Sequence, residues 1–290
     1  MGYRRRVRRA LALTAAILLG GCGSISQVAT SPSATLTSAP PVVRATPVPS
    51  SVTVSAETPT ATTRDWQDVA PGVSVRLDSV TLGSSVPAQV TTVRVAQPAG
   101  RLRVGYAPST PTAISDWAAA HPSALVMING GYFDEAFRTT SLLVSEGVGA
   151  GRSYVGFGGM LSMSSKGVVS LRSLRDHPYS PSEKPRQAVQ SFPMLVIDGA
   201  ETSLPNDNGR YARRSILAVD AQARLLFIAV EGGWTLPETA TWLVGSGLGI
   251  TQALNLDGGS STGMVVQTPT YRRVVDAWNV LPIVIWVEGT

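Results

Sequence analysis

The chain has 290 residues, of which 43% are hydrophobic and 15% charged, a composition typical of a packed globular protein that excludes a chain disordered throughout. It carries 24 lysines and arginines against 19 aspartates and glutamates. Five of the arginines lie at positions 4, 5, 6, 8 and 9, and without them basic and acidic residues number 19 each. Because the rest of the chain has no basic excess, we expect no nucleic-acid partner.

The first 22 residues are typical of a bacterial export signal. The basic cluster is followed by LALTAAILLGGC, an apolar run too short to cross a membrane comfortably. Its end, Leu19 to Cys22, resembles the lipobox of bacterial lipoproteins, in which the cysteine is lipidated and becomes the first mature residue. The alternative is an ordinary signal peptide with an incidental cysteine. Cys22 is the only cysteine, so no disulfide within the chain can stabilise the fold.

Residues 23–63 are rich in serine, threonine, alanine and proline and carry almost no charge. Their few apolar side chains are too irregularly spaced to offset the entropy lost on ordering, which predicts a disordered tether. A lipid at Cys22 and this tether would hold a folded domain, residues 64–290, outside the cytoplasm and anchored to the bacterial membrane. A domain of this length fits a single α+β or β-rich fold.

Short runs of β-branched and apolar residues predict strands at residues 73–80, 91–97, 101–107 and 123–130. Between the third and fourth runs, residues 112–121 predict a helix that ends before Pro122. Further strands are expected in the runs SLLVSEG, GVVSLRSL and MLVIDG. The expected fold class is therefore α+β, with a mainly antiparallel or mixed β-sheet core and a few flanking helices.

The C-terminal part of the domain contains the strongest local signals. The runs SILAVD and RLLFIAVEG, joined by a polar turn at residues 220–223, predict a β-hairpin. A helix is predicted after Thr235, which serves as its N-cap with Glu238 as the capping-box partner and Pro237 in the first turn. This helix leads into a short apolar strand and then a glycine-rich turn.

That turn lies in the run LNLDGGSSTGM, residues 254–264. Glycines let successive main-chain amides point the same way, so Gly258 and Gly259 predict a small anion-binding turn. Neutral donors would be added by the hydroxyls of Ser260, Ser261 and Thr262. Asp257 would repel a bare anion, so it is expected to be a metal ligand, a sugar hydrogen-bond acceptor, or a base or nucleophile at a carbon centre. The alternative is a tight turn without a ligand.

The run MINGGYFD, residues 127–134, has the same pattern. An apolar strand ends in Asn129, and Gly130 and Gly131 follow. Two strand ends of this kind predict two loops that converge on one pocket. A type I′ hairpin is the alternative, because Asn-Gly is its usual signal.

Other polar residues stand at strand ends, namely Gln190, Arg214 and Glu231. Arginine suits bidentate phosphate contact, although a solvated strand-end charge is the alternative. With two histidines in the chain, a serine triad or a histidine-ligated metal is poorly supported. Asp257, Glu231 and Asp134 could gather a divalent cation such as Ca²⁺, but no loop has a recognised calcium spacing.

Five runs, NGGYFD, QSFPMLV, RRSILAVD, VEGGWTLPETATWL and ALNLDGGSSTGMV, resemble those of the phosphodiester glycosidase family in order and approximate spacing, over about residues 106–288. The resemblance implies hydrolysis of a sugar–phosphate diester at the glycosidic bond, which releases a sugar and leaves a phosphomonoester. The family's motif positions are occupied by Asn129, Gly130, Gly131, Gln190, Arg214, Glu231 and residues 257–262. Many members carry a third glycine where this chain has Ser260, so the phosphate contact does not carry over directly.

The residues and the resemblance together suggest roles. Cleavage at an anomeric carbon with a phosphate leaving group needs charge stabilisation more than acid assistance. Arg214, with the amides and hydroxyls of residues 258–261, would stabilise the phosphate. Asp257 or Glu231 would act as nucleophile or as base for water, in a cleft shared with Asn129. The alternatives are a non-catalytic module that binds phosphorylated envelope glycans and a tethered structural lipoprotein.

Overall fold

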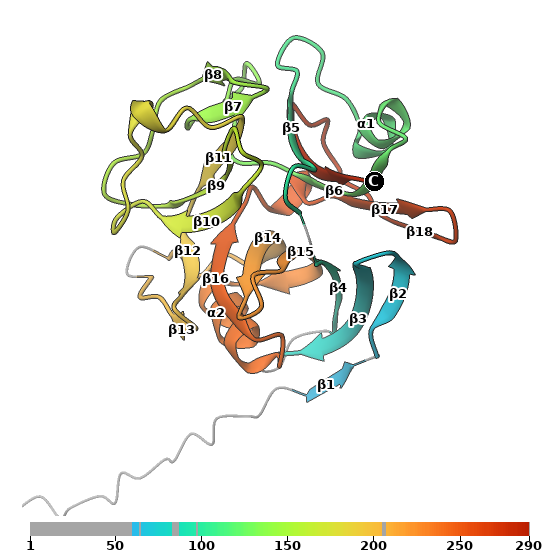
Figure 1. Ribbon diagram of the computed structural model, residues 1–290. Helices are drawn as coiled ribbons and strands as arrows, with labels where there is room; N and C mark the ends of the chain where they lie inside the picture. Colours follow the sequence, from blue (N-terminus) through green and yellow to red (C-terminus); the bar gives the residue numbers. More distant parts are fainter. Residues whose placement is uncertain (1–59, 64, 83–86, 97, 205–206, 290) are drawn as a thin grey trace, which may run out of the picture. The chain divides into compact units, whose positions relative to one another are not determined.

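The computed structural model describes residues 60–63, 65–82, 87–96, 98–204 and 207–289. The predicted signal, Cys22 and the predicted tether up to residue 59 lie outside the described residues. The described part consists mainly of β-strands arranged in three sheets (Figure 1). It also contains two α-helices and two short 3-10 turns, η1 (Pro181–Glu183) and η2 (Gly259–Ser261).

The largest sheet has nine strands, in the order β1-β3-β4-β15-β14-β16-β12-β13, and β2 also pairs with β3. The strands are β1 (Thr60–Thr63), β2 (Gln67–Ala70), β3 (Val73–Thr81), β4 (Ala88–Val95), β12 (Met194–Ile197), β13 (Ala200–Glu201), β14 (Ala212–Asp220), β15 (Leu225–Trp234) and β16 (Ile250–Asn255). β14 and β15 form the hairpin predicted around residues 220–223, with Ile216 opposite Ile228. The predicted tether, residues 23–63, is wrong at its C-terminal end. There β1 forms a strand, because its main chain pairs with the edge of β3.

The two smaller sheets have five strands each. One follows the order β10-β9-β11-β7-β8 and the other β18-β17-β6-β19-β5. The first is made of β7 (Leu143–Ser145), β8 (Val148–Ala150), β9 (Gly159–Met163), β10 (Val169–Ser173) and β11 (Gln187–Ser191). The second is made of β5 (Leu102–Tyr106), β6 (Ala124–Asn129), β17 (Met264–Thr268), β18 (Tyr271–Val275) and β19 (Ile283–Glu288).

One face of each sheet contributes to a common hydrophobic core. Side chains alternate between the two faces of a strand, so each sheet can turn an apolar face inward. Phe227 of the large sheet, Leu161 of the β9 sheet and Ile285 of the β19 sheet belong to one buried cluster. Burial of this shared apolar surface stabilises the three sheets against one another.

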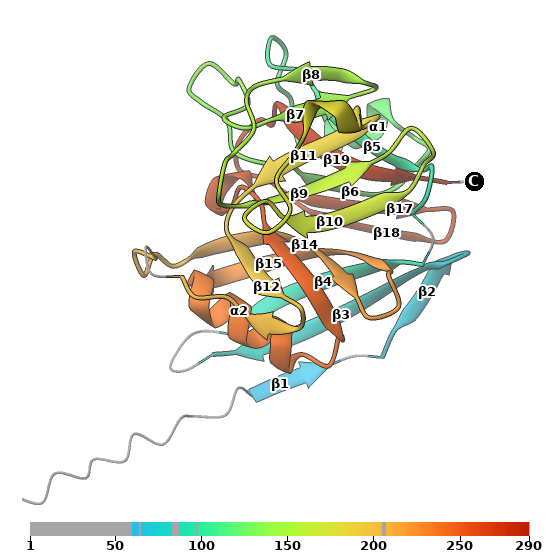
Figure 2. The same cartoon turned by 60° about the vertical axis from the view of Figure 1, so that its left-hand side comes forward.

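The two α-helices cover outer faces of the sheets. α2 (Leu236–Gly245) begins at Thr235 with the predicted capping box and packs Trp242 and Leu243 on the large sheet, and Figure 2 shows it beside β12. α1 (Ile114–Ala120) ends at His121 and packs Trp117 on the β19 sheet. Neither helix in the described ranges has the length and hydropathy needed to span a bilayer.

The expected sheet core is confirmed in its main feature, since every strand pair in the described part is antiparallel. The α+β class is accurate only in part, because two helices accompany three sheets and the fold is mostly β. The alternative of a mixed sheet, which requires parallel pairs, is not found among the described strands. Many sequential strands are joined by short hairpins, and hairpins produce antiparallel neighbours.

Candidate active site

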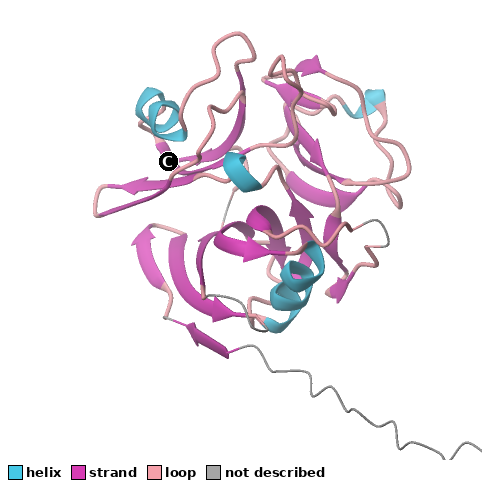
Figure 3. Ribbon diagram, turned by 180° about the vertical axis from the view of Figure 1, so that it is seen from behind, coloured by secondary structure: helices cyan, strands magenta, loops and turns pink. Residues whose placement is uncertain are grey.

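A cavity of about 510 Å³ brings Asp257 and Arg214 together. We call it the Asp257 cavity, and it is lined by Tyr132, Phe133, Asp207, Asn208, Arg210, Ala212, Arg214, Leu236, Asp257, Gly258, Gly259, Ser260, Ser261 and Asn279. Arg214 lies on β14, which pairs with β16, and Asp257 follows the end of β16. The 3-10 turn η2, next to Asp257, is the short helical turn near the middle of Figure 3.

The carboxylate of Asp257 is mostly buried. Its Oδ1 accepts a hydrogen bond from the amide of Gly258 at 2.9 Å, and the hydroxyl of Ser261 also hydrogen bonds to it. Burial raises the pKa of Asp257 above its ordinary value of 3.8, and these two hydrogen bonds only partly oppose the rise. No lysine, arginine or histidine in the described part forms an ion pair with Asp257.

Arg214 is held by main-chain oxygens and not by a carboxylate. Its Nε donates to the carbonyl of Trp234 at 2.8 Å and one terminal nitrogen, Nη2, donates to the carbonyl of Arg210 at 2.7 Å. Only 8% of the residue is exposed, and burial lowers its pKa, although a guanidinium stays charged in proteins. Within the described ranges Nη1 has no hydrogen-bond partner and Arg214 has no ion-pair partner. The site therefore contains a fixed positive charge that a bound anion could neutralise.

Tyr132 lines the same cavity and is close to both charges. Burial raises the pKa of its phenol above 10, the nearby Asp257 raises it further, and Arg214 acts in the opposite direction. The phenol is therefore neutral at ordinary pH. Its hydroxyl donates to the carbonyl of Phe192 at 3.1 Å and accepts from Nδ2 of Asn255 at 2.8 Å.

Asn129 lies behind the cavity and does not line it. It is buried at the end of β6, and its Nδ2 donates to the carbonyl of Asp257 at 2.8 Å. Its Oδ1 accepts from the hydroxyl of Ser215 at 2.7 Å and from the amide of Gly263 at 3.2 Å. Asn129 thus fixes the position of the Asp257 turn relative to β14. Its side chain does not reach the cavity in which a ligand would bind.

The paired glycines after Asn129 serve close packing. β6 pairs with β17 and β19, so the alternative of a type I′ hairpin at this position is wrong. A side chain at Gly130 would overlap Ile283, and a Cβ at Gly131 would lie 2.6 Å from the carbonyl oxygen of Gln190. The glycines let the strand end approach its neighbours, and neither lines the Asp257 cavity.

Gln190 also supports the site from outside the cavity. Its fully buried side chain accepts from the amide of Tyr154 at 2.9 Å and donates to the hydroxyl of Ser153 at 2.8 Å. It therefore holds the loop at residues 153–154 against β11. The sequence-based prediction of a substrate contact by Gln190 is not matched by its position.

The predicted anion-binding turn differs in detail from the expectation. The amide of Gly258 is taken by Asp257, and the amides of Ser261 and Thr262 close the η2 turn. Gly259 adopts a positive φ of 60°, which few other residues tolerate, and the amides of Gly259 and Ser260 have no acceptor among the described residues. The hydroxyl of Ser260 accepts from Asn279 at 2.7 Å. Thr262 is buried and lies outside the cavity lining.

Glu231 is not brought to the Asp257 cavity. Val230 lies opposite Arg214 in the β14–β15 pair, so Glu231 points to the other face of the sheet. There it forms an ion pair with Arg273 at 2.7 Å. The sequence could not distinguish these faces, because a shift of one residue along a strand reverses the direction of a side chain.

The three acids considered for a divalent cation do not gather. Glu231 pairs with Arg273, and Asp134 pairs with Arg138 at 2.9 Å. No group of three or more His, Cys, Asp or Glu that could hold a metal ion occurs in the described ranges. The residues suggested for Ca²⁺ therefore do not form one site.

The amino-acid sequence around this site matches a known protein family. The model of the phosphodiester glycosidase family matches residues 123–282, more than half of the chain. The chain belongs to this family. The matched segment contains Asn129, Arg214 and Asp257, and thus the whole arrangement described above.

Two solved structures share the fold of this phosphodiester glycosidase domain. One is the zebrafish N-acetylglucosamine-1-phosphodiester alpha-N-acetylglucosaminidase catalytic domain auto-inhibited by its pro-peptide, with a TM-score of 0.61 and 16% identity over 80% of this chain and 89% of that chain. The other is a hypothetical protein from Synechocystis, with a TM-score of 0.53 and 16% identity over 80% of this chain and 65% of that chain. At these identities the likeness establishes the fold alone. No curated protein sequence matches the chain.

Several lining residues of the phosphodiester glycosidase domain were not predicted to act in a site. They are Asp207, Asn208, Arg210 and Asn279. Asp207 lies close enough to Arg214 to raise the pKa of the guanidinium. The only signal for the first three is the polar run DNGR, which is equally typical of a surface turn.

Proposed function

We propose that the protein hydrolyses the glycosidic bond of a sugar 1-phosphodiester, releasing the sugar and leaving a phosphomonoester. One observation supports this most directly: Arg214 and Asp257 share a cavity, and neither has an ion-pair partner of opposite charge among the described residues. Such a pair suits a substrate that has an anionic group next to an electrophilic carbon. Family membership gives the same class of reaction.

Arg214 binds the phosphate in this proposal. Its Nη1 is available, and Gly259 and Ser260, whose amides are neutral donors, line the same cavity. As the bond to the anomeric carbon breaks, negative charge grows on the phosphate oxygen. A guanidinium already fixed by two carbonyl oxygens stabilises that charge without reorganisation.

Asp257 acts on the sugar side. A carboxylate whose pKa is raised by burial is a stronger base than an ordinary aspartate, and it accepts a proton from the water that attacks the anomeric carbon. The water oxygen bonds to that carbon, and the electron pair of the broken bond stays on the phosphate. Because the phosphate already leaves as a stable anion, a second carboxylate such as Glu231 is not required.

The test uses a panel of methyl diesters of glucose, galactose, mannose and N-acetylglucosamine 1-phosphates, with released sugar as the readout. We expect the full chain to hydrolyse at least one, and Asp257→Asn to lower kcat by about 10²–10⁴-fold, as for other general bases. Calorimetric binding of methyl phosphate should persist in this variant. Absence of turnover in the parent with retained binding would replace the hydrolase with the binding module.

A second variant tests the phosphate contact. We expect Arg214→Gln to lower kcat/KM by about 10²–10³-fold, the range found when one preorganised donor is removed. Arg213→Gln is the matched control, because Arg213 is the next residue of β14 and stacks on Trp278 outside the cavity lining. Equal losses in the two variants would contradict a phosphate role for Arg214.

We also propose that the domain acts on a glycan or glycolipid of the cell envelope. The support is the sequence of the N-terminal segment: a lipobox-like end at Cys22 and a proline-rich segment with almost no charge after it. A lipid at Cys22 would anchor the protein to the outer side of the bacterial membrane. The domain would then work within the reach of its tether.

A further inference from the structure

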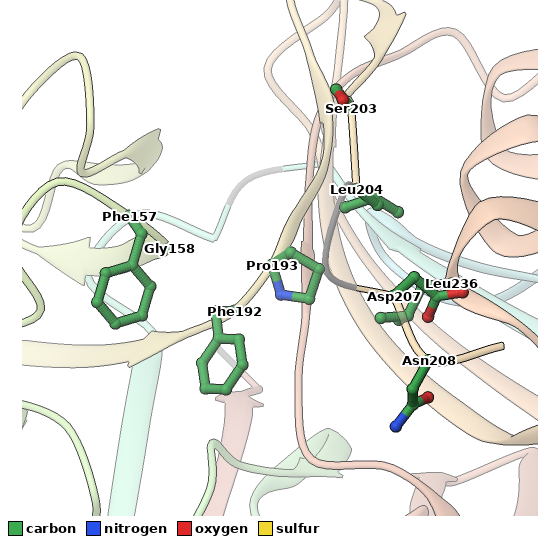
Figure 4. Close-up of a pocket in the computed structure, with 9 residues that line it drawn as sticks. All are labelled: Phe157, Gly158, Phe192, Pro193, Ser203, Leu204, Asp207, Asn208 and Leu236. Atoms are coloured by element: carbon green, nitrogen blue, oxygen red, sulfur yellow. The ribbon is translucent and has the colours of Figure 1, made fainter. Parts of the chain in front are cut away.

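An apolar cleft adjoins the Asp257 cavity. Its volume is about 590 Å³, and it is lined by Phe157, Gly158, Phe192, Pro193, Ser203, Leu204, Asp207, Asn208 and Leu236 (Figure 4). We call it the Phe157 cleft. Asp207, Asn208 and Leu236 line both spaces, so the cleft continues the cavity and does not form a separate site.

An aromatic cluster joins the two spaces. The ring of Tyr132, in the Asp257 cavity, lies 4.7 Å from that of Phe192 in the cleft. Phe192 lies 5.8 Å from Phe157, whose ring is 4.6 Å from Tyr154. Figure 4 shows Phe157 and Phe192 next to each other in the cleft wall, and the two residues are 48% and 40% exposed, respectively. Large apolar side chains gathered on the surface beside a polar cavity mark a binding surface for an apolar group.

The lining of the cleft does not resemble that of the cavity. Its main contributors are phenylalanine, proline and leucine, and its one charged residue, Asp207, stands on the shared boundary. A second sugar in the cleft would leave many hydroxyls without hydrogen-bond partners, which is costly on burial. A hydrocarbon needs no such partners and gains from leaving water.

A phosphodiester has two arms. The proposed function gives the sugar and the phosphate to the Asp257 cavity, where the polar donors and the carboxylate lie. The second alcohol then leaves the cavity on the side bounded by Asp207, Asn208 and Leu236, where the Phe157 cleft begins. The lining of the Phe157 cleft therefore indicates which class of alcohol can bind there.

We propose that the second alcohol of the substrate is a hydrocarbon chain, so that the protein cleaves the sugar from the phosphate of a lipid-type alcohol and not from the phosphate of another glycan. This inference rests on the proposed function, because it names the substrate class of the same site. The apolar arm lies against Phe157, Phe192 and Leu204. Its product is an alkyl phosphate that remains in the cleft after the sugar leaves.

The first experiment compares hexyl phosphate with methyl phosphate by titration calorimetry on the full chain. The protein is kept in lipid nanodiscs, because detergent would itself occupy an apolar cleft. We expect hexyl phosphate to bind at least about 10-fold more tightly, which corresponds to about 1.4 kcal/mol. The same ratio is expected in kcat/KM between hexyl and methyl diesters of the sugar 1-phosphate that is hydrolysed best.

Variants distinguish binding in the Phe157 cleft from nonspecific hydrophobic binding elsewhere on the protein. Phe157→Ser should reduce the hexyl advantage to less than about 3-fold and leave methyl phosphate binding unchanged, whereas Phe157→Leu should keep the advantage because it stays apolar. Val148→Ser is the control, since Val148 is also an exposed apolar residue and lines neither space. This variant should change the affinity for neither hexyl phosphate nor methyl phosphate.

The outcomes distinguish the two proposals. Equal binding and turnover of hexyl and methyl compounds, or a preference over both for a diester whose second alcohol is a sugar, would overturn the lipid-type substrate and leave the hydrolase intact. Tighter binding of hexyl phosphate that Phe157→Ser abolishes, without turnover of any diester, would support the cleft and overturn the hydrolase. A hexyl advantage unaffected by Phe157→Ser would mean that the chain binds elsewhere, which also contradicts the proposal.

Discussion

Asp257 is in a costly environment for an ionised carboxylate, and the cost has a measurable consequence. The pKa of Asp257 is raised in the folded chain, while in the unfolded chain it has the ordinary value of an aspartate, about 3.9. Below both values the group is protonated in both states and has no effect. As the pH rises through this window the unfolded chain loses its proton first, so stability falls and remains lower at neutral pH.

We therefore predict that Asp257→Asn melts at a higher temperature than the parent at pH 7, because asparagine never ionises. Its Oδ1 can still accept from the amide of Gly258. Differential scanning calorimetry between pH 7 and pH 4 should show the gap narrowing as the pH falls. A variant that is less stable than the parent at pH 7 would show that Asp257 is stabilised by its surroundings, and the argument for a raised pKa would fail.

The glycine after Gly130 provides a second residue-scale prediction. At Gly131 a methyl group would lie 2.6 Å from the carbonyl of Gln190, whereas at Gly149 it would meet nothing within 4 Å. We expect Gly131→Ala to lower the free energy of unfolding by about 1–3 kcal/mol, the usual cost of overpacking, and Gly149→Ala to change it by less than about 0.5 kcal/mol. Urea titrations of both variants test this. Similar values would mean that the strand end moves freely away from Gln190.

At the scale of elements, the capping of α2 is local and can be read from the sequence. The hydroxyl of Thr235 accepts from the amide of Glu238 at 3.3 Å, and the carboxylate of Glu238 accepts from the amide of Thr235 at 2.8 Å. Both residues belong to one turn of chain. No distant contact is needed to form this box.

We predict that Thr235→Ala lowers the free energy of unfolding by about 1 kcal/mol, because one helix N-terminal amide loses its acceptor. Thr241→Ala is the control within the same helix, since its exposed hydroxyl contacts only Glu201. Guanidinium or urea unfolding of both variants checks the prediction. If the two lose equal stability, the capping box contributes nothing beyond an ordinary surface hydrogen bond.

The strands and the hairpin between β14 and β15 were predicted for similar reasons, since turn chemistry and alternation act over a few residues. The face to which each strand residue points was not predictable to the same degree. Arg214 and Glu231 stand on paired strands of one hairpin, yet the first lines the cavity and the second pairs with Arg273 on the other side. The register of the β14–β15 pair decides this, and register depends on which face the rest of the molecule buries.

At the scale of the whole molecule, we expect the N-terminal segment and the folded domain to have separate roles. We predict that the mature protein begins at Cys22 and carries a lipid there. Intact-mass measurement of protein extracted from bacterial membranes should show a mass increment for the lipid, which Cys22→Ser should abolish. A mature chain that begins beyond Cys22, or that carries no lipid, would contradict the anchor and leave the function of the domain unaffected.

The sequence by itself determined many of the strands, both helices and the two polar strand ends at Asn129 and Asp257, because these depend on neighbours within one or two turns of chain. Only the tertiary structure decided which polar residues line the cavity. Asn129 and Gln190 support the cavity from behind, while Tyr132, Asp207 and Asn279 line it. These positions depend on three sheets burying a common core, and burial acts between residues far apart in the chain, where short-range patterns contain no information about distance.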